Sequence, residues 1–233
     1  MKVISLNTKT EWKNKRKIGG TDLCAIVNDK GRWNNIVEIY ERIVNAKTPK
    51  DQSTIKTKMG TLAENHIRQL FLLQHSELDS IYSYKDIILC ISDLSDYITL
   101  SPDTLITDRN TNEKGFIEIK YKEITNENKI GDYLLNLKER EPQYYWQLIH
   151  YFVVDEKATF GYLVVAFVIK QHNEYQKTII ESLKINRDDV KDDVELATNK
   201  LLDFIKNNIE KKQKPYFEKG DIDIWQKFMN SKQ

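Results

Sequence analysis

The chain has 233 residues, which is long enough for one sizeable hydrophobic core, and we expect a single domain over residues 1 to 233. Its composition, 40% hydrophobic and 30% charged residues, is that of a water-soluble protein, and no apolar run is long enough to cross a membrane as a helix. The formal net charge of +1 excludes an overall attraction to a polyanion, so contact with one would depend on local clusters of basic residues.

The first residues of the chain carry such a cluster. Residues 1 to 17 contain six basic side chains and one acid, Glu11, which gives a local charge of +5. Such a run is typical either of a solvated tail or of a segment that binds an anion. The same region lacks the apolar stretch and the cleavage site of a secretory signal, and Cys24 and Cys90 suit reduced, buried thiols, so we expect a cytoplasmic protein.

A short helix is predicted over residues 22 to 28, with Thr21 as its N-cap and the pair Gly19-Gly20 just ahead of it. Amide groups at a helix start can bind a phosphate, and an ordinary cap after a flexible turn is the alternative. Three basic residues precede this helix start: Lys15, Arg16 and Lys17.

Two amphipathic helices are predicted next, one over residues 33 to 46 and one within residues 51 to 74 that begins near Ser53 or Thr54. Glu64 flanks the apolar side of the second helix; such a glutamate is commonly solvated, but Gly60, four residues earlier, lets another element or DNA pass close by. The predicted buried stripe of this helix consists of Met59, Leu62, Ala63, Ile67, Leu70 and Phe71.

Strands dominate the middle of the chain. Residues 78 to 90 predict one or two strands, and residues 96 to 100 and 115 to 121 predict two more, because β-branched and aromatic residues are dense there. Pro102 cannot donate to a ladder and therefore ends the strand before it. Pairing of the last two strands would bring Asp103 beside Glu118.

The remaining elements are predicted to be largely scaffold. Residues 122 to 141 are polar and predict a mobile excursion beside a substrate path, whereas Pro142 begins a helix that runs to Val154. His150 in that helix fits a surface or partly buried histidine better than a metal ligand. One face of the helix carries Tyr144, Gln147 and Tyr151. Two buried strands and a long final helix follow, over residues 159 to 169, 178 to 185 and 188 to 211.

The chemistry of the chain is expected at Asp103, Glu118 and Lys120. Alternation along the strand places Glu118 and Lys120 on one face. Two carboxylates and a lysine at a sheet edge suit metal-assisted phosphodiester cleavage, because carboxylate oxygens hold Mg²⁺ and the ammonium adds positive charge near the attacking water or the phosphorus. The alternative is a solvated acid and base on the outer face of an edge strand.

Five blocks of residues in a fixed order resemble the phage lambda exonuclease family, also called the YqaJ-like viral recombinases, within the PD-(D/E)xK nucleases. The resemblance covers roughly residues 12 to 155; the last strands and helix, in residues 156 to 233, lie beyond it. It implies an α/β fold with a restriction-endonuclease-like core, a central mixed β-sheet flanked by helices. The blocks are Ile18-Gly19-Gly20-Thr21-Asp22, Gly60-Thr61-Leu62-Ala63-Glu64-Asn65, Ser101-Pro102-Asp103, Glu118-Ile119-Lys120 and Tyr144-Tyr145-Trp146-Gln147.

The resemblance implies roles for these residues. Asp103, Glu118 and the carbonyl of Ile119 would hold a metal ion, and Glu64 would serve a second ion or its water shell. Lys120 would then orient and activate the attacking water.

Further residues are assigned by the same resemblance. Gln147 would fix the geometry of the site, and Tyr144, which matches a neighbouring family tyrosine, would help to bind the DNA or its 5′-phosphate. Thr21, Gly20 and the basic residues ahead of them would hold a terminal 5′-phosphate. Where the family has an arginine seven residues before this threonine, the chain has Asn14.

The implied activity is 5′→3′ digestion of duplex DNA from its ends in phage-type recombination, with Mg²⁺ as cofactor and Mn²⁺ able to replace it. The implied setting is the cytoplasm of a bacterium or a phage-infected host, with a single-strand annealing protein as partner and a ring-shaped homotrimer as assembly. Two other functions stay open: a restriction-like or structure-specific endonuclease on the same core, and a DNA-binding module that does not cut. The intact set of two acids and a lysine disfavours the module.

Overall fold

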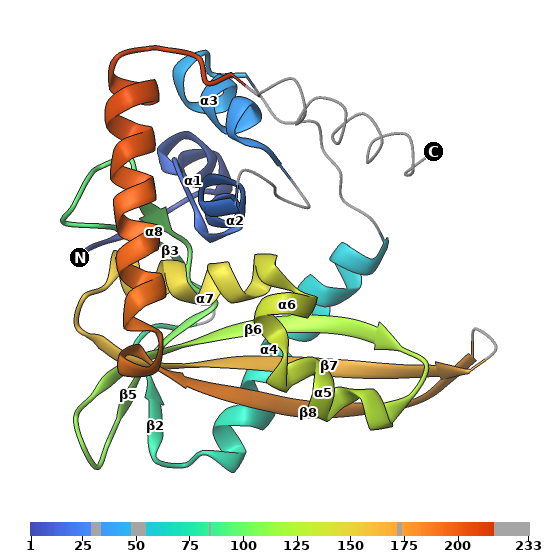
Figure 1. The fold of residues 1–233 in the computed structure, drawn as a ribbon. Coiled ribbons are helices and arrows are strands. Elements are labelled where there is room, and N and C mark those ends of the chain that lie inside the picture. Colours follow the sequence, from blue (N-terminus) through green and yellow to red (C-terminus); the bar gives the residue numbers. More distant parts are fainter. Residues whose placement is uncertain (29–33, 48–54, 84, 172–173, 217–233) are drawn as a thin grey trace.

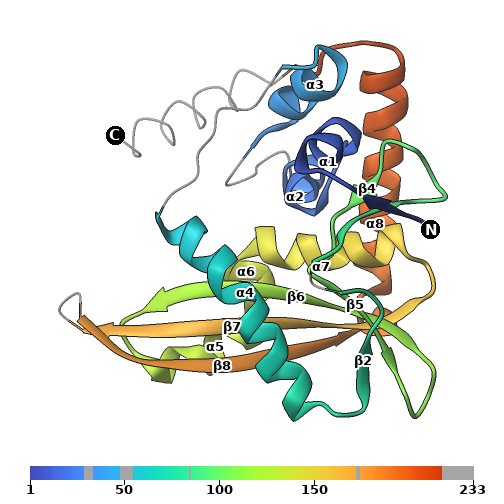
Figure 2. The same cartoon turned by 180° about the vertical axis from the view of Figure 1, so that it is seen from behind.

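The computed structural model describes residues 1–28, 34–47, 55–83, 85–171 and 174–216, in which the strands form two sheets (Figures 1 and 2). The smaller sheet has the order β1-β3-β4 and the larger one β2-β5-β6-β7-β8. In the larger sheet β6 and β7 are parallel and all other neighbours are antiparallel, so the sheet is mixed, as predicted. The strands are β1 (Lys2–Leu6), β2 (Leu78–Ser80), β3 (Ile87–Ile91), β4 (Thr99–Leu100), β5 (Thr104–Asp108), β6 (Lys114–Ile124), β7 (Ala158–Gln171) and β8 (Glu174–Asn186).

Helices cover both faces of the larger sheet, which gives the restriction-endonuclease-like α/β fold expected from the sequence. Helix α4 lies across one face (Figure 2), and the opposite face is covered by α5, α6 and α7 (Figure 1). None of the helices in the described ranges has the length and apolar character of a membrane span. The α-helices are α1 (Lys9–Lys15), α2 (Gly20–Asn28), α3 (Ile36–Val44), α4 (Ile55–Gln74), α5 (Ile130–Leu135), α6 (Leu137–Arg140), α7 (Pro142–Val154) and α8 (Lys191–Phe204). Shorter turns are η1 (Glu127–Lys129), η2 (Arg187–Val190) and the π-helical η3 (Ile205–Glu210).

The parallel pair β6 and β7 explains why the core lies where it does. A parallel connection needs a crossover, and here α5, α6 and α7 supply it, so the apolar sides of these helices pack on one face of the sheet. Strand β7 is apolar along most of its length and buried on both faces. The predicted helix at Pro142, the last two strands and the long helical run at the end of the chain are confirmed. Cys24 and Cys90 are buried, reduced thiols, as predicted.

The predicted hairpin between residues 96 to 100 and 115 to 121 is wrong. Strand β4 pairs with β3 in the smaller sheet, and the antiparallel partner of β6 is β5, which begins directly after Asp103. Pro102 lies between β4 and β5: it follows the end of β4, as predicted, but the strand that pairs with β6 begins after it. Asp103 still lies next to Glu118, because it stands one residue beyond the pair formed by Thr104 and Ile117.

Two further local predictions are corrected. Helix α2 begins at Gly20, so Thr21 lies in its first turn and is not the N-cap. Residues 122 to 141 are not an irregular excursion: β6 continues to Ile124, and η1, α5 and α6 follow. Their apolar residues are widely spaced, which hid the short helices, but Ile130, Tyr133 and Leu137 are buried in the core.

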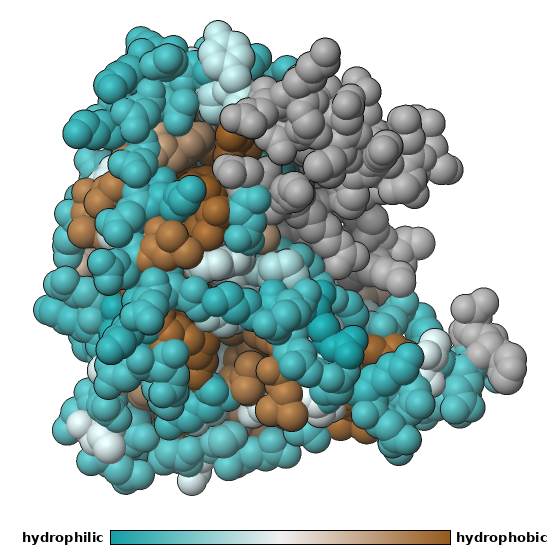
Figure 3. Space-filling view, in the orientation of Figure 1, coloured by the Kyte–Doolittle hydropathy of each residue, from teal (hydrophilic) through white to brown (hydrophobic). Residues whose placement is uncertain are grey.

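The predicted buried stripe of α4 is only partly correct. Ile67 and Phe71 are buried against the sheet, whereas Met59, Leu62 and Leu70 expose 48%, 72% and 50% of their surface. The residues before Ile55 that belonged to the predicted helix lie outside the described residues. In the described part of the chain α4 is the one helix on this face of the sheet, so only its narrow inner side is covered. On the opposite side of the molecule, apolar residues gather in separate small patches (Figure 3).

We predict that Ile67→Ala lowers the free energy of unfolding by about 2–4 kcal/mol, because it leaves a cavity between α4 and the sheet. The matched variant Leu62→Ala on the same helix should change it by less than about 0.5 kcal/mol, since that side chain is exposed. Urea denaturation of both variants measures the difference. Equal losses would contradict the burial described for α4.

Candidate active site

The candidate site lies at the start of β5, where β6 continues beyond its ladder with β5. The ladder between the two strands covers β6 only as far as Ile117, so the next backbone groups of β6 face no strand on that side among the described residues. Asp103 takes the place of a strand there: its Oδ2 accepts a hydrogen bond from the Ile119 amide at 2.8 Å. The Asp103 carboxylate is thereby fixed against β6 beside Glu118.

Glu118 points into the layer between the sheet and α7 and is only 1% exposed. Its Oε2 accepts a hydrogen bond of 2.6 Å from the Tyr151 hydroxyl, and its Oε1 forms an ion pair with Lys120. The Lys120 side chain retains 16% of its exposure and lies over the ring of Tyr144, 5.2 Å from the centroid. The alternative of a solvated acid and base on an outer strand is therefore wrong.

Helix α4 brings a third acid to this place. Glu64 forms a hydrogen-bonded ion pair with Arg68, at 3.0 Å. The same guanidinium donates to the carbonyl of Asp103 at 2.7 Å and to the hydroxyl of Thr104 at 2.5 Å. Gly60, one turn before Glu64, lets α4 pass close to β6, where Tyr121 would be the nearest contact of an added methyl group. A cavity of about 120 Å³ opens onto Glu64, Arg68 and Asp103.

Burial and mutual repulsion govern the charges of these acids. Burial raises the pKa of Asp103 well above its ordinary value, and the nearby Glu118 raises it further. Burial also raises the pKa of Glu64, against the opposing effect of Arg68. Burial disfavours the Lys120 ammonium, but the carboxylates of Glu118 and Asp103 outweigh that effect and raise its pKa. The carboxylates thus lie where additional positive charge stabilises their ionised forms.

The donor set fits a hard divalent cation. Carboxylate and carbonyl oxygens are the ligands that Mg²⁺ prefers, and few are needed because water and phosphate complete its shell. Among the described residues no three His, Cys, Asp or Glu side chains already converge on one point, since Lys120 and Arg68 hold one oxygen each of Glu118 and Glu64. The Oε1 atom of Gln147 is buried and has no hydrogen-bond partner in the described part of the chain. Such an atom is expected where a side chain contacts a bound ligand or its water.

The start of α2 forms a second part of the site. Arg16 stacks over the ring of Trp12, 5.0 Å from its centroid, and donates to the hydroxyl of Thr21 at 3.1 Å. A side chain on Gly19 would meet the Arg16 guanidinium, and one on Gly20 would lie 2.8 Å from Cγ of Gln147. The two glycines therefore permit close packing between the basic segment, α2 and α7.

Backbone hydrogen bonds join this segment to the strand ahead of Asp103. Ile18 donates to the carbonyl of Tyr97 at 2.9 Å, and Thr99 donates to the carbonyl of Ile18 at 2.8 Å. The amide of Lys17 reaches the hydroxyl of Thr99 at 3.0 Å. Arg16 and Thr21 are thus brought near the carboxylates, whereas Lys15 is exposed at the end of α1.

Two residues of the site received no role in the sequence analysis. Arg68 ties α4 to Asp103, and its spacing of four residues from Glu64 was the available signal. Tyr151 contacts Glu118, and its place on the same helix face as Tyr144 and Gln147 was the corresponding signal. Neither spacing could reveal that α4 and α7 approach the start of β5.

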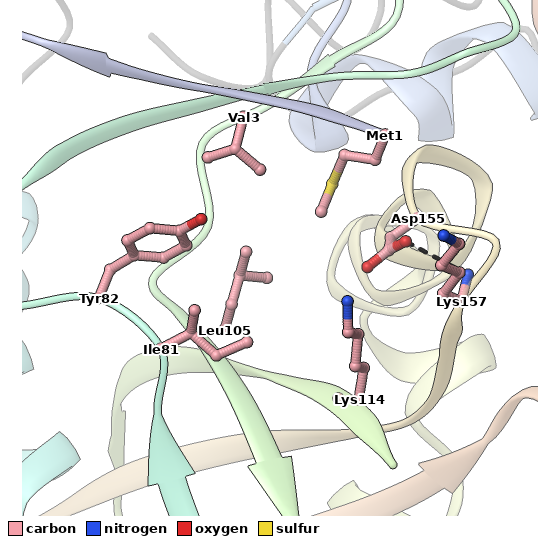
Figure 4. A pocket seen from close by; sticks show the side chains of 9 residues that line it. Met1, Val3, Ile81, Tyr82, Leu105, Lys114, Asp155 and Lys157 are labelled. Atoms are coloured by element: carbon pink, nitrogen blue, oxygen red, sulfur yellow. Dashed lines mark hydrogen bonds between the residues drawn. The ribbon is translucent and has the colours of Figure 1, made fainter. Parts of the chain in front are cut away.

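A further cavity, of about 140 Å³, lies elsewhere (Figure 4). It is lined by Ile81, Tyr82, Leu105 and three charged residues, Lys114, Asp155 and Lys157, and it contains none of the acids described above. It shares Tyr82 and Leu105 with the cavity at Glu64, so the two cavities are neighbours.

Comparison with solved structures identifies the fold as that of a group of exonucleases. LHK-Exo, an alkaline exonuclease from Laribacter hongkongensis, has 16% identity and a TM-score of 0.57, over 88% of this chain and 97% of its own. Its complex with dAMP gives 15% identity and a TM-score of 0.58, over 89% and 97%. A phage-related exonuclease from Haemophilus somnus 129PT gives 13% and 0.54, over 86% and 99%.

The family is identified by sequence. The model of the YqaJ-like viral recombinase domain matches residues 11–158, which is more than half of the chain. The protein therefore belongs to the YqaJ-like viral recombinase family, as the order of its five sequence blocks indicated. No curated protein matches the chain.

His150 is fully buried behind the site, not on the helix surface. Its Nε2 lies 2.8 Å from the carbonyl of Thr99. Burial lowers the pKa of His150 from 6.5 to about 4, so the native state resists a proton that the unfolded chain accepts.

The contribution of neutral, buried His150 to the free energy of unfolding should therefore be fully present above pH 6.5. It should be lost as the pH drops from 6.5 towards 4, which lowers the free energy of unfolding by about 3 kcal/mol. His150→Gln keeps a donor for Thr99 but does not titrate, so its loss over this range should be smaller by that amount. Denaturant unfolding of both proteins at several pH values measures this, and parallel pH profiles would contradict it.

Proposed function

We propose that this protein is a Mg²⁺-dependent nuclease that digests duplex DNA from its 5′ ends in phage-type recombination, in a bacterial or phage-infected cytoplasm. The observation that carries the proposal is the gathering of Asp103, Glu118 and Lys120 at the start of β5, in a member of the YqaJ-like viral recombinase family. Its structural neighbours include proteins named as exonucleases, which supports end-directed digestion over other phosphodiester chemistry.

The acids would hold the cation. We assign Asp103, Glu118 and the carbonyl of Ile119 to one ion, and Glu64 to a second ion or its water shell. Bound Mg²⁺, or Mn²⁺ in its place, supplies Lewis-acid stabilisation of the phosphate and a water of lowered pKa. Glu64 is held by Arg68 near this position, and Arg68 also steadies Asp103 through its carbonyl.

Other side chains would position the reactants. Lys120 pairs with Glu118 in this structure, and with a cation held by the acids its ammonium would be placed to orient the attacking water beside the phosphate. Gln147 has an unpartnered Oε1 in the described part of the chain and can accept a hydrogen bond from that water shell. Tyr144 limits the movement of Lys120, because its ring lies beneath the ammonium.

Asp103→Ala and Glu118→Ala should each lower the rate of DNA cleavage at least about a hundredfold, because each removes a cation ligand. Lys120→Ala should lower turnover while Mg²⁺ binding persists. Asp79→Ala is the matched control, since this exposed carboxylate pairs with Arg109 outside the site. Digestion of linear duplex DNA and calorimetric Mg²⁺ titration measure the two effects. Wild-type cleavage by Asp103→Ala would refute the assignment.

The start of α2 would bind the 5′-phosphate. We assign this role to Thr21, the backbone around Gly20, and Arg16, with Lys15 and Lys17 adding positive charge. The chain has Asn14 where the family has its arginine, and Arg16 reaches the Thr21 hydroxyl from a different position. A terminal phosphate monoester carries more charge than an internal diester, so a pocket built around this guanidinium favours ends.

A duplex with 5′-phosphates should therefore be digested about tenfold faster than one without them, the effect of about one charge-assisted hydrogen bond. Arg16→Ala should remove most of this preference. Lys13→Ala, which alters an exposed neighbour, should retain it.

A restriction-like or structure-specific endonuclease on the same core is the second candidate, because Asn14 replaces the family arginine. Supercoiled circular DNA separates the two functions, since it has no ends. Linearisation of the circle as fast as digestion of phosphorylated linear duplex would favour the endonuclease. Mg²⁺-dependent binding of DNA without any cleavage would favour a module that does not cut.

The same proposal includes a ring-shaped homotrimer that feeds a single-strand annealing protein. A closed ring retains a digested duplex in its channel, which suits repeated cleavage from one end. Light scattering at micromolar concentration should give three times the mass of one chain. The mass of a single chain would refute the ring and leave the assignment of the acids untouched.

A further inference from the structure

The hydroxyl of Tyr151 joins two of the acid-bearing residues. It donates to Oε2 of Glu118 at 2.6 Å and accepts a hydrogen bond from the amide of Asp103 at 3.0 Å. A hydroxyl has one proton to donate, and Glu118 receives it. The hydrogen bond from Asp103 polarises the hydroxyl and strengthens its donation to the carboxylate.

The Tyr151 ring has little freedom to move. It is 1% exposed and stacks on Phe116, with the centroids 4.2 Å apart and the planes 16° from parallel. Phe116 in turn lies over Gly161 of β7, where any added side chain would meet its ring. The hydroxyl is therefore held by packing and cannot follow a displacement of the carboxylate.

This arrangement treats the two oxygens of Glu118 differently. Oε2 faces the buried hydroxyl, and Oε1 faces Lys120, a side chain that can move. A cation approaching the site can displace the ammonium from Oε1, but it would have to break the hydrogen bond of Tyr151 to reach Oε2. Oε1 of Glu118 is thus available to a cation, whereas Oε2 stays hydrogen-bonded to Tyr151.

We propose that Tyr151 is a positioning residue that restricts Glu118 to one metal-binding oxygen and thereby favours Mg²⁺ over larger divalent cations. Mg²⁺ binds single carboxylate oxygens in a strict octahedron, whereas Ca²⁺ takes more ligands and readily binds both oxygens of a carboxylate. The inference rests on the proposed function, because it requires that Asp103 and Glu118 hold a cation.

Tyr151→Phe removes the hydroxyl and keeps the stacked ring. Isothermal titration of DNA-free protein with Mg²⁺ and with Ca²⁺ gives a dissociation constant for each ion. In the variant, the ratio of the Ca²⁺ constant to the Mg²⁺ constant should fall at least about tenfold, because Glu118 can turn and offer both oxygens. A partly unfolded sample lowers the number of sites for both ions equally and leaves the ratio unchanged.

Tyr145→Phe is the matched control, because it removes a hydroxyl from the same helix that bonds to Asp193, outside the site. It should leave the ratio at its wild-type value. A Tyr151→Phe ratio within about twofold of wild type would overturn the inference while the proposed cation site stands. Failure of the wild-type protein to bind either ion would overturn both.

An infrared measurement on the wild-type protein tests the inference without Tyr151→Phe. The two carboxylate stretching bands of a one-oxygen ligand lie farther apart than those of a two-oxygen ligand. Mg²⁺ minus metal-free difference spectra of wild type, with Glu118→Gln to assign the bands, should show a separation no narrower than that of the metal-free carboxylate. A separation clearly below the metal-free value, as for a carboxylate that binds with both oxygens, would refute the role given to Tyr151.

Discussion

The unequal length of β5 and β6 is the constraint on which the candidate site depends. Because the ladder stops at the pair Thr104 and Ile117, the amide of Ile119 has no strand partner on that side and is bonded by the Asp103 carboxylate. The same interruption leaves room for α4 to approach from one face and α7 from the other. Glu64 and Tyr151 therefore both reach the start of β5. A longer β5 would fill this space with backbone and keep the acids apart.

Charge balance explains the contacts around the acids. Three carboxylates lie near one another, and burial raises the pKa of Asp103 and of Glu64, which disfavours their ionised forms. Lys120 and Arg68 supply positive charge from β6 and α4, and each holds one acid in place. The two cations are held differently: Arg68 donates three hydrogen bonds, whereas Lys120 pairs with Glu118 and lies over the ring of Tyr144.

The start of α2 and the acids share one structural frame. Hydrogen bonds between residues 17 to 18 and 97 to 99 attach the basic segment to the strand that leads to Asp103, and Gly20 packs directly on Gln147. Buried Asp22 secures the other side, because it accepts hydrogen bonds from the amide of Gly19 and from Arg42. The proposed 5′-phosphate site and the proposed cation site are therefore held at a fixed separation, which would suit digestion from an end.

The sequence by itself determined the elements with strong local patterns. These include β6, β7, β8, α7 and the final helix, because alternation and helical spacing are local properties. The order of the five sequence blocks indicated the family and its mixed sheet, and the roles of the acids and the lysine stay a prediction. Only the tertiary structure decided that β5, not β4, pairs with β6, and that Leu62 and Leu70 of α4 stay exposed while Ile67 is buried. It alone decided that Arg16 reaches Thr21 and that Tyr151 reaches Glu118. Strand partners and contacts between distant residues depend on how separate elements pack, and no local pattern carries that information.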